Sequence, residues 1–136
     1  MGLNVYDYGV VPTPVLAFLI KKSGTPGVMV TASHNPPEWN GLQFMEEDSH
    51  IFGPEEENMT KGKIDNESKA LRFCEWNQFG QVLLQDNGID TYVKEIVKSK
   101  QMGNRKLKVV LDYGNGTAWT VLPKICRALW IPMYRS

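Results

Sequence analysis

The chain has 136 residues, enough for one ordinary domain or for two incomplete ones. Its 15 basic and 15 acidic residues balance, so no overall charge draws it to nucleic acid or to an anionic membrane surface. Cys74 and Cys126 are too few and too far apart for a metal motif or a disulfide framework. Without a long apolar span or a leader-like start, we expect a cytoplasmic protein that contacts no membrane.

The first part of the chain predicts a strand, a helix and a strand. Residues 4–6 form a short strand candidate, and Thr13 can cap a helix that begins at Pro14 and ends near Gly24. Residues 27–31, "GVMVT", are too short for a helix, and the unbroken apolar run predicts a strand buried on both faces. This order of elements indicates a parallel crossover unit.

The rest of the chain continues the alternation of strands and helices. We predict strands at 41–45, 107–111 and 131–134, a helix beginning near Gly53-Pro54, and further helices at 89–99 and 117–129. The expected fold class is α/β, with two partial three-layer α/β/α domains that contain mixed, largely parallel sheets. The predicted division is a first domain at 1–62, a linker at 63–87 where periodicity fades, and a second domain at 88–136.

A polar segment, Thr31-Ala32-Ser33-His34-Asn35-Pro36-Pro37, follows the strand at 27–31. Ligands of open α/β sheets bind beyond the carboxyl ends of the strands, so Ser33 is expected at a binding site. The plain interpretation is a polar turn that satisfies local backbone groups. A hydrolase nucleophile is the alternative, but neighbouring Ser33 and His34 should point apart on an extended backbone, and the sequence has no Gly-x-Ser-x-Gly elbow.

Residues 31–36, together with Asn40-Gly41, closely resemble the phosphoserine loop of the α-D-phosphohexomutase family. That family includes the phosphoglucomutases, phosphomannomutases and phosphoglucosamine mutases. Upstream, "VYDYGVVPTP" at 5–14 is similar to the strand, turn and helix start of the family's first domain. Residues 89–99 and 109–129 resemble, more weakly, the opening of its second domain. The resemblance therefore covers parts of two domains.

The resemblance implies an isomerase that moves phosphate between C1 and C6 of a hexose phosphate through a phosphoserine and a hexose bisphosphate. By this resemblance Ser33 would carry the phosphoryl group. Its location suits that role, since phosphoryl transfer depends mainly on alignment and charge neutralisation. His34 would be a nearby proton-handling or hydrogen-bonding group. The residues that would support the loop and the substrate are Thr31, Asn35, Asn40 and Gln43.

Several working parts of the family cannot be found in this sequence. Mg²⁺ is the implied cofactor, bound to Ser33 through its phosphate, but the Asp-Gly-Asp-x-Asp-Arg stretch that would supply the carboxylates is missing. Gln43 stands where the family usually has lysine, and its neutral amide can only form hydrogen bonds. We therefore expect an incomplete, inactive piece of a phosphohexomutase. The alternative is a non-catalytic phosphosugar-binding or remnant module that associates with a partner through incomplete sheet edges.

Overall fold

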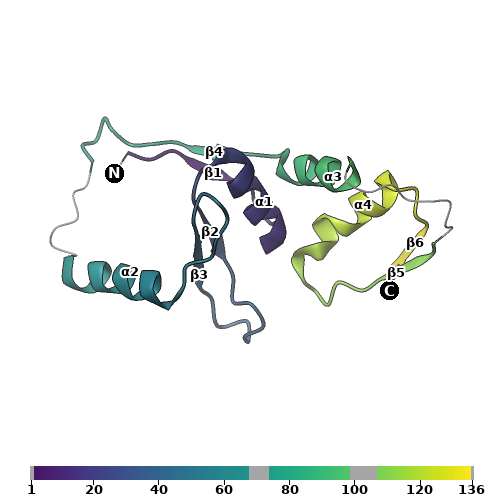
Figure 1. Cartoon of the computed structure of the whole chain (residues 1–136), viewed down its shortest axis with the longest axis horizontal. Helices are drawn as coiled ribbons and strands as arrows, with labels where there is room; N and C mark the ends of the chain where they lie inside the picture. The colour runs from purple at the N-terminus through teal and green to yellow at the C-terminus, as the bar shows by residue number, and fades with distance from the viewer. Residues whose placement is uncertain (1, 68–73, 99–106, 136) are drawn as a thin grey trace. The chain divides into compact units, whose positions relative to one another are not determined.

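The computed structural model describes residues 2–67, 74–98 and 107–135 (Figure 1). Helices alternate with short strands, and two of the three two-stranded sheets in the described residues are parallel. This arrangement confirms the predicted α/β class. Contacts divide the chain into two compact units. Unit 1 comprises Met1–Asp7 and Ile20–Leu84, and unit 2 comprises Tyr8–Leu19 and Gln85–Ser136.

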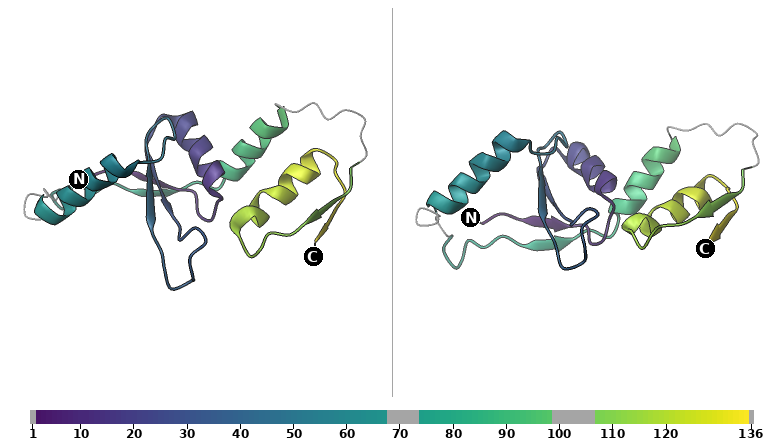
Figure 2. Two further views of the ribbon diagram at one scale, coloured as in Figure 1. Left: turned by 60° about the horizontal axis from the view of Figure 1, so that its bottom comes forward. Right: turned by 90° about the horizontal axis from the view of Figure 1, so that it is seen from below.

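Unit 1 contains two pairs of strands and one long helix. Strand β1 (Val5–Asp7) pairs in parallel with β4 (Val82–Leu84), and the two run side by side in each view of Figures 1 and 2. Strand β2 (Gly27–Val30) pairs antiparallel with β3 (Leu42–Met45). Helix α2 (Pro54–Glu67) follows β3. Three acidic residues in its first turn favour its start, because they interact well with the positive end of the helix dipole.

Two predictions for unit 1 are wrong, and two of its features were not predicted. The strand at 27–31 is not buried on both faces, because Val28 and Val30, which share one face, are 45% and 61% exposed. Strands β1 and β2 do not pair, so the expected parallel crossover does not appear in the described residues. Strand β4 was not predicted at all, and α2 runs on to Glu67, inside the predicted linker. The predicted division of the chain into a domain at 1–62, a linker and a domain at 88–136 stays a prediction.

Helix α1 (Thr13–Ser23) has the predicted bounds. Lys21 and Lys22 lie in its last turn, where cations interact favourably with the helix dipole. Gly24 adopts φ +62°, and its N–H donates to the Ile20 carbonyl at 2.9 Å. That left-handed conformation suits glycine and ends the helix.

Unit 2 contains α3 (Gly88–Lys98) and a parallel pair of strands, β5 (Val109–Leu111) and β6 (Met133–Arg135). The helix predicted at 117–129 is divided into a 3₁₀ turn (Thr117–Thr120) and α4 (Leu122–Ala128). Pro123 gives the reason: it has no N–H to donate to the preceding turn, and it suits the first turn of a new helix. The last residue of the helix predicted at 89–99 lies outside the described residues.

The core of unit 2 holds its segments together. Buried Val15 and Leu19 of α1 pack with Val93 of α3 and with Val121, which precedes α4. The Phe18 ring meets Tyr92 edge-on, with ring centroids 5.4 Å apart. This apolar contact explains why residues far apart in sequence form one unit.

One ion pair joins the helices of unit 2. Lys124 Nζ of α4 lies 2.6 Å from Asp90 Oδ1 of α3. The hydrogen bond from Lys124, followed by its positive charge, lowers the pKa of Asp90 below its ordinary value. Among the described residues, no helix is long and apolar enough to cross a membrane.

Candidate functional site

The loop that carries Ser33 is closed at its base by hydrogen bonds beyond the β2–β3 pairing. The Thr31 N–H donates to the Gly41 carbonyl at 2.9 Å. Asn40 Oδ1 accepts a hydrogen bond from the Gly41 N–H, also at 2.9 Å. The Thr31–Gly41 bond joins the two ends of the loop, so that Ser33 is held just past the carboxyl end of β2, and the Asn40 bond orders the return of the chain to β3.

Ser33 has an unusual backbone conformation. Its φ of +54° lies in the left-handed region, which costs a residue other than glycine about 1–2 kcal/mol. Two short bonds hold this turn: the Ser33 N–H donates to Thr31 Oγ1, and the Asn35 N–H donates to the Ala32 carbonyl, each at 3.0 Å. A strained residue that its neighbours hold in place is typical of functional loops.

This conformation brings the Ser33 hydroxyl close to the neighbouring imidazole. Ser33 Oγ and His34 Nδ1 are 3.1 Å apart. The expectation that these side chains point apart is wrong, because it assumed an extended backbone and Ser33 has a positive φ. With the imidazole proton on Nε2, His34 Nδ1 accepts the hydrogen bond from the hydroxyl.

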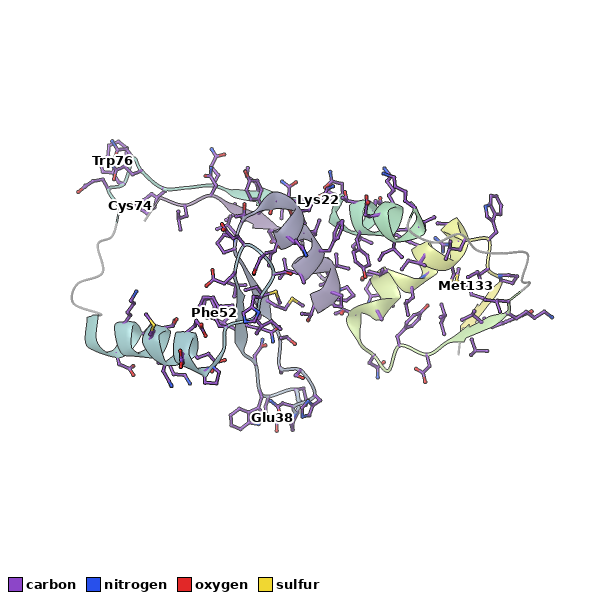
Figure 3. All side chains as sticks on the ribbon, viewed as in Figure 1. Lys22, Glu38, Phe52, Cys74, Trp76 and Met133 are labelled. Atoms are coloured by element: carbon purple, nitrogen blue, oxygen red, sulfur yellow. The ribbon has the colours of Figure 1, made fainter. Side chains whose placement is uncertain are left out.

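Beyond His34, the loop extends away from the rest of unit 1. The Trp39 N–H donates to the Pro36 carbonyl at 3.0 Å, which closes a turn over the two prolines. Figure 3 shows Glu38 at the outer end of the loop, well away from Phe52, where the chain passes from β3 to α2. Trp39 is 64% exposed. Ser33 and His34 are therefore near the base of the loop, and the prolines lie towards its outer end.

A pocket of about 480 Å³ opens between this loop, β3 and α2. The volume is in the range typical of small-molecule sites. Stacked rings of Phe44 and Phe52, with centroids 5.6 Å apart, form part of its apolar wall. The pocket brings together five of the six predicted site residues; His34 is not among the residues that line it. The five are Thr31, Ser33, Asn35, Asn40 and Gln43.

Helix α2 contributes residues to this pocket that the sequence did not reveal. Glu57, Thr60 and Lys61 line it from one face of the helix. The start of α2 is fixed by a hydrogen bond from the Gly53 N–H to Glu56 Oε2 at 2.9 Å. The motif Gly53-Pro54 predicted the helix, but no local signal says which face of it meets the serine loop.

The charged residues of the pocket are few. Among the described residues that line it, Lys61 is the only cation and Glu57 the only anion. Elsewhere in the described parts of the chain, no three His, Cys, Asp or Glu side chains are placed to hold a metal ion. The pocket thus offers hydroxyls, amides, one ammonium group and one carboxylate, which can donate and accept hydrogen bonds.

The fold thus places a strained serine just past a strand end in an α/β unit, beside a pocket that combines hydroxyl, amide and apolar groups. Residues 1–71, more than half of the chain, match the family model described as phosphoglucomutase/phosphomannomutase, alpha/beta/alpha domain I. The chain belongs to the phosphoglucomutase/phosphomannomutase family.

Individual relatives agree with this assignment. A probable phosphoglucosamine mutase from Methanopyrus kandleri is 34% identical over 94% of this chain. A phosphoglucosamine mutase from Thermosipho africanus is 33% identical over 91% of it. The crystal structure of a phosphoglucomutase/phosphomannomutase family protein from Burkholderia thailandensis matches 99% of the chain with a TM-score of 0.77 and 30% identity.

The chain is short beside these proteins. It spans 28% of the length of the relatives from Methanopyrus kandleri and Thermosipho africanus. It covers 30% of the solved structure. The relatives named phosphoglucosamine mutase are isomerases, and residues 1–71 of this chain correspond to domain I of the family.

Proposed function

We propose that Ser33 is the phosphoryl carrier of a cytoplasmic phosphohexomutase that moves phosphate between C1 and C6 of a hexose phosphate. The single observation that carries the proposal is the left-handed Ser33, held by Thr31 at the edge of the pocket between the loop, β3 and α2. Glucosamine phosphate is the favoured substrate, because the relatives above are named phosphoglucosamine mutases.

The proposed step exchanges one P–O bond for another. Ser33 Oγ attacks a phosphorus atom of a hexose bisphosphate, the Oγ–P bond forms, and the bond from phosphorus to the sugar oxygen breaks. His34 Nδ1, 3.1 Å away, receives the Ser33 proton, and the released sugar oxygen takes a proton from solvent. In the return step a sugar hydroxyl attacks the same phosphorus and gives its proton to solvent, the bond from phosphorus to Ser33 Oγ breaks, and Ser33 Oγ takes back the proton from His34 Nδ1.

The remaining predicted residues have supporting roles. Thr31 holds the Ser33 amide, and Asn40 holds the base of the loop. The Asn35 and Gln43 amides line the pocket, where they can donate hydrogen bonds to sugar hydroxyls or phosphate oxygens. Alignment of this kind supplies a large part of the rate enhancement in phosphoryl transfer.

Mg²⁺ remains the proposed cofactor by family resemblance. The described residues do not form a carboxylate site for it, and the sequence lacks the Asp-Gly-Asp stretch. No step is therefore assigned to the ion here. For the same reason we propose that the chain alone does not turn over substrate. A coupled assay with glucosamine, glucose or mannose 1-phosphate should show no product, and measurable turnover would refute this part of the proposal.

Phosphorylation of the chain tests the role of Ser33. After incubation with a hexose 1,6-bisphosphate and Mg²⁺, intact-mass spectrometry should detect one added phosphoryl group per wild-type chain. Ser33→Ala should take none, and Ser49→Ala serves as the control, because Ser49 also has a positive φ (+73°) but does not line the pocket. An unmodified wild-type chain, or equal labelling of Ser33→Ala, would refute the proposal.

A second candidate function follows from the exposed strands of unit 1. Val82 and Leu84 of β4 are 68% and 74% exposed, and Val30 of β2 is 61% exposed. Apolar strands with open edges favour association with another chain. This supports a non-catalytic module that binds phosphosugar and completes its fold with a partner. Sedimentation should then show self-association, and a compact monomer would exclude it.

A further inference from the structure

The phosphoryl group proposed on Ser33 would bring a large negative charge to the pocket. A phosphoserine carries about 1.5–2 negative charges near neutral pH. Gln43, which lines the same pocket, is neutral. Any charge compensation from this chain must therefore come from another residue.

Lys61 is the residue placed to provide it. It lines the pocket together with Ser33 and, among the described lining residues, is the only cation. No carboxylate within the described residues lies at salt-bridge distance from its ammonium group. Because the Lys61 side chain is long and lies on an exposed face of α2, its ammonium group can move to contact a phosphate without displacing buried neighbours.

We propose that Lys61 of α2 binds the phosphoryl group on Ser33 and supplies the positive charge that Gln43 does not. The inference rests on the proposed function of Ser33 and adds a residue from an element outside the serine loop. Glu57, about one turn earlier on α2, lines the same pocket and opposes this attraction. The two residues together set how strongly the pocket holds a dianion.

The test uses the full 136-residue chain with phosphoserine placed at position 33 by genetic encoding, so it requires no enzymatic transfer. Phosphorus NMR follows the second ionisation of the phosphate, which lies near pH ~6. Because Lys61 favours the dianion, Lys61→Met should move the titration midpoint up by roughly 0.2–0.7 pH unit. Lys63→Met is the matched control, since Lys63 is an exposed α2 lysine that does not line the pocket.

Three further variants make the result specific. Gln43→Lys should move the midpoint down, and in the Lys61→Met background it should restore the wild-type value. Glu57→Gln should also move the midpoint down, because it removes a negative charge. Lys61→Gln repeats the test with a polar side chain, and the amide spectrum of each variant shows whether the chain is folded.

Equal midpoints for Lys61→Met and wild type, or equal shifts for Lys61→Met and Lys63→Met, would overturn the inference. The proposed function fails in a different way. The unmodified chain could take no phosphate from a hexose bisphosphate while Lys61→Met still raises the titration midpoint of the encoded phosphoserine. That result would support the contact between Lys61 and the phosphate and refute the transfer reaction.

Discussion

The hydroxyl of Thr31 holds the strained turn at Ser33, and its removal tests whether the loop is preorganised. Thr31→Val keeps the shape of the side chain but removes the oxygen that accepts from the Ser33 N–H at 3.0 Å. A hydrogen bond of this kind contributes about 1 kcal/mol net. The left-handed conformation at φ +54° costs about 1–2 kcal/mol, so this bond offsets a substantial part of the strain.

The loss of about 1 kcal/mol corresponds to a roughly fivefold change in the equilibrium between the held and the open turn. Amide hydrogen exchange measured by NMR reads this equilibrium directly. The protection of the Ser33 amide should fall about fivefold in Thr31→Val and stay close to wild type in Thr31→Ser, which keeps the oxygen.

The Trp39 amide provides the internal control. It donates to the Pro36 carbonyl in a separate turn of the same loop, so its exchange should not change. Unchanged protection of Ser33 in Thr31→Val would refute the reasoning. An equal loss at Ser33 and Trp39 would also refute it, because the whole loop would then have opened instead of one turn.

Three other substitutions test the structure more widely. Ser33→Gly should raise the free energy of unfolding by about 1 kcal/mol in urea denaturation, because glycine accepts φ +54° without strain; a decrease would contradict the strain. Leu19→Ala should destabilise unit 2 by about 3 kcal/mol, because Leu19 is buried in its core. Val10→Ala is the control and should change stability little, because the Val10 side chain is 62% exposed. Equal effects of the two substitutions would contradict the assigned core. Lys124→Met should raise the pKa of Asp90 towards 3.8, read by NMR titration of its carboxyl carbon. Because folding lowers that pKa, the ion pair stabilises the folded wild-type chain above pH 3.8, and this contribution is lost as the pH falls through the lower pKa of the folded state. The stability of Lys124→Met should not show this loss in acid. Identical dependence of stability on pH in the two proteins would contradict the pairing.

Features that depend on neighbouring residues were predicted well. Thr13-Pro14 and Gly24 mark the two ends of α1, and Gly53-Pro54 marks the start of α2. The position of Ser33 directly after β2 could also be predicted, because the apolar run and the polar segment adjoin in sequence.

Features that depend on distant residues or on a single torsion angle were not predicted. The pairing of β1 with β4 is non-local, and the hydrogen bond from the Gln81 N–H to Asn4 Oδ1 spans 77 residues. Nothing in a three-residue apolar run such as β4 indicates a partner that far away. The positive φ of Ser33 could not be predicted either, since serine seldom adopts it. The short distance between Ser33 Oγ and His34 Nδ1 depends on that torsion angle and was missed for the same reason. Lys61 reaches the candidate site only through the packing of α2.

The most direct test of the central claim is the location of the phosphate after incubation of the chain with glucosamine 1,6-bisphosphate. Peptide sequencing by tandem mass spectrometry should place it on Ser33. A phosphate on His34 instead, or no phosphate at all, would contradict the account.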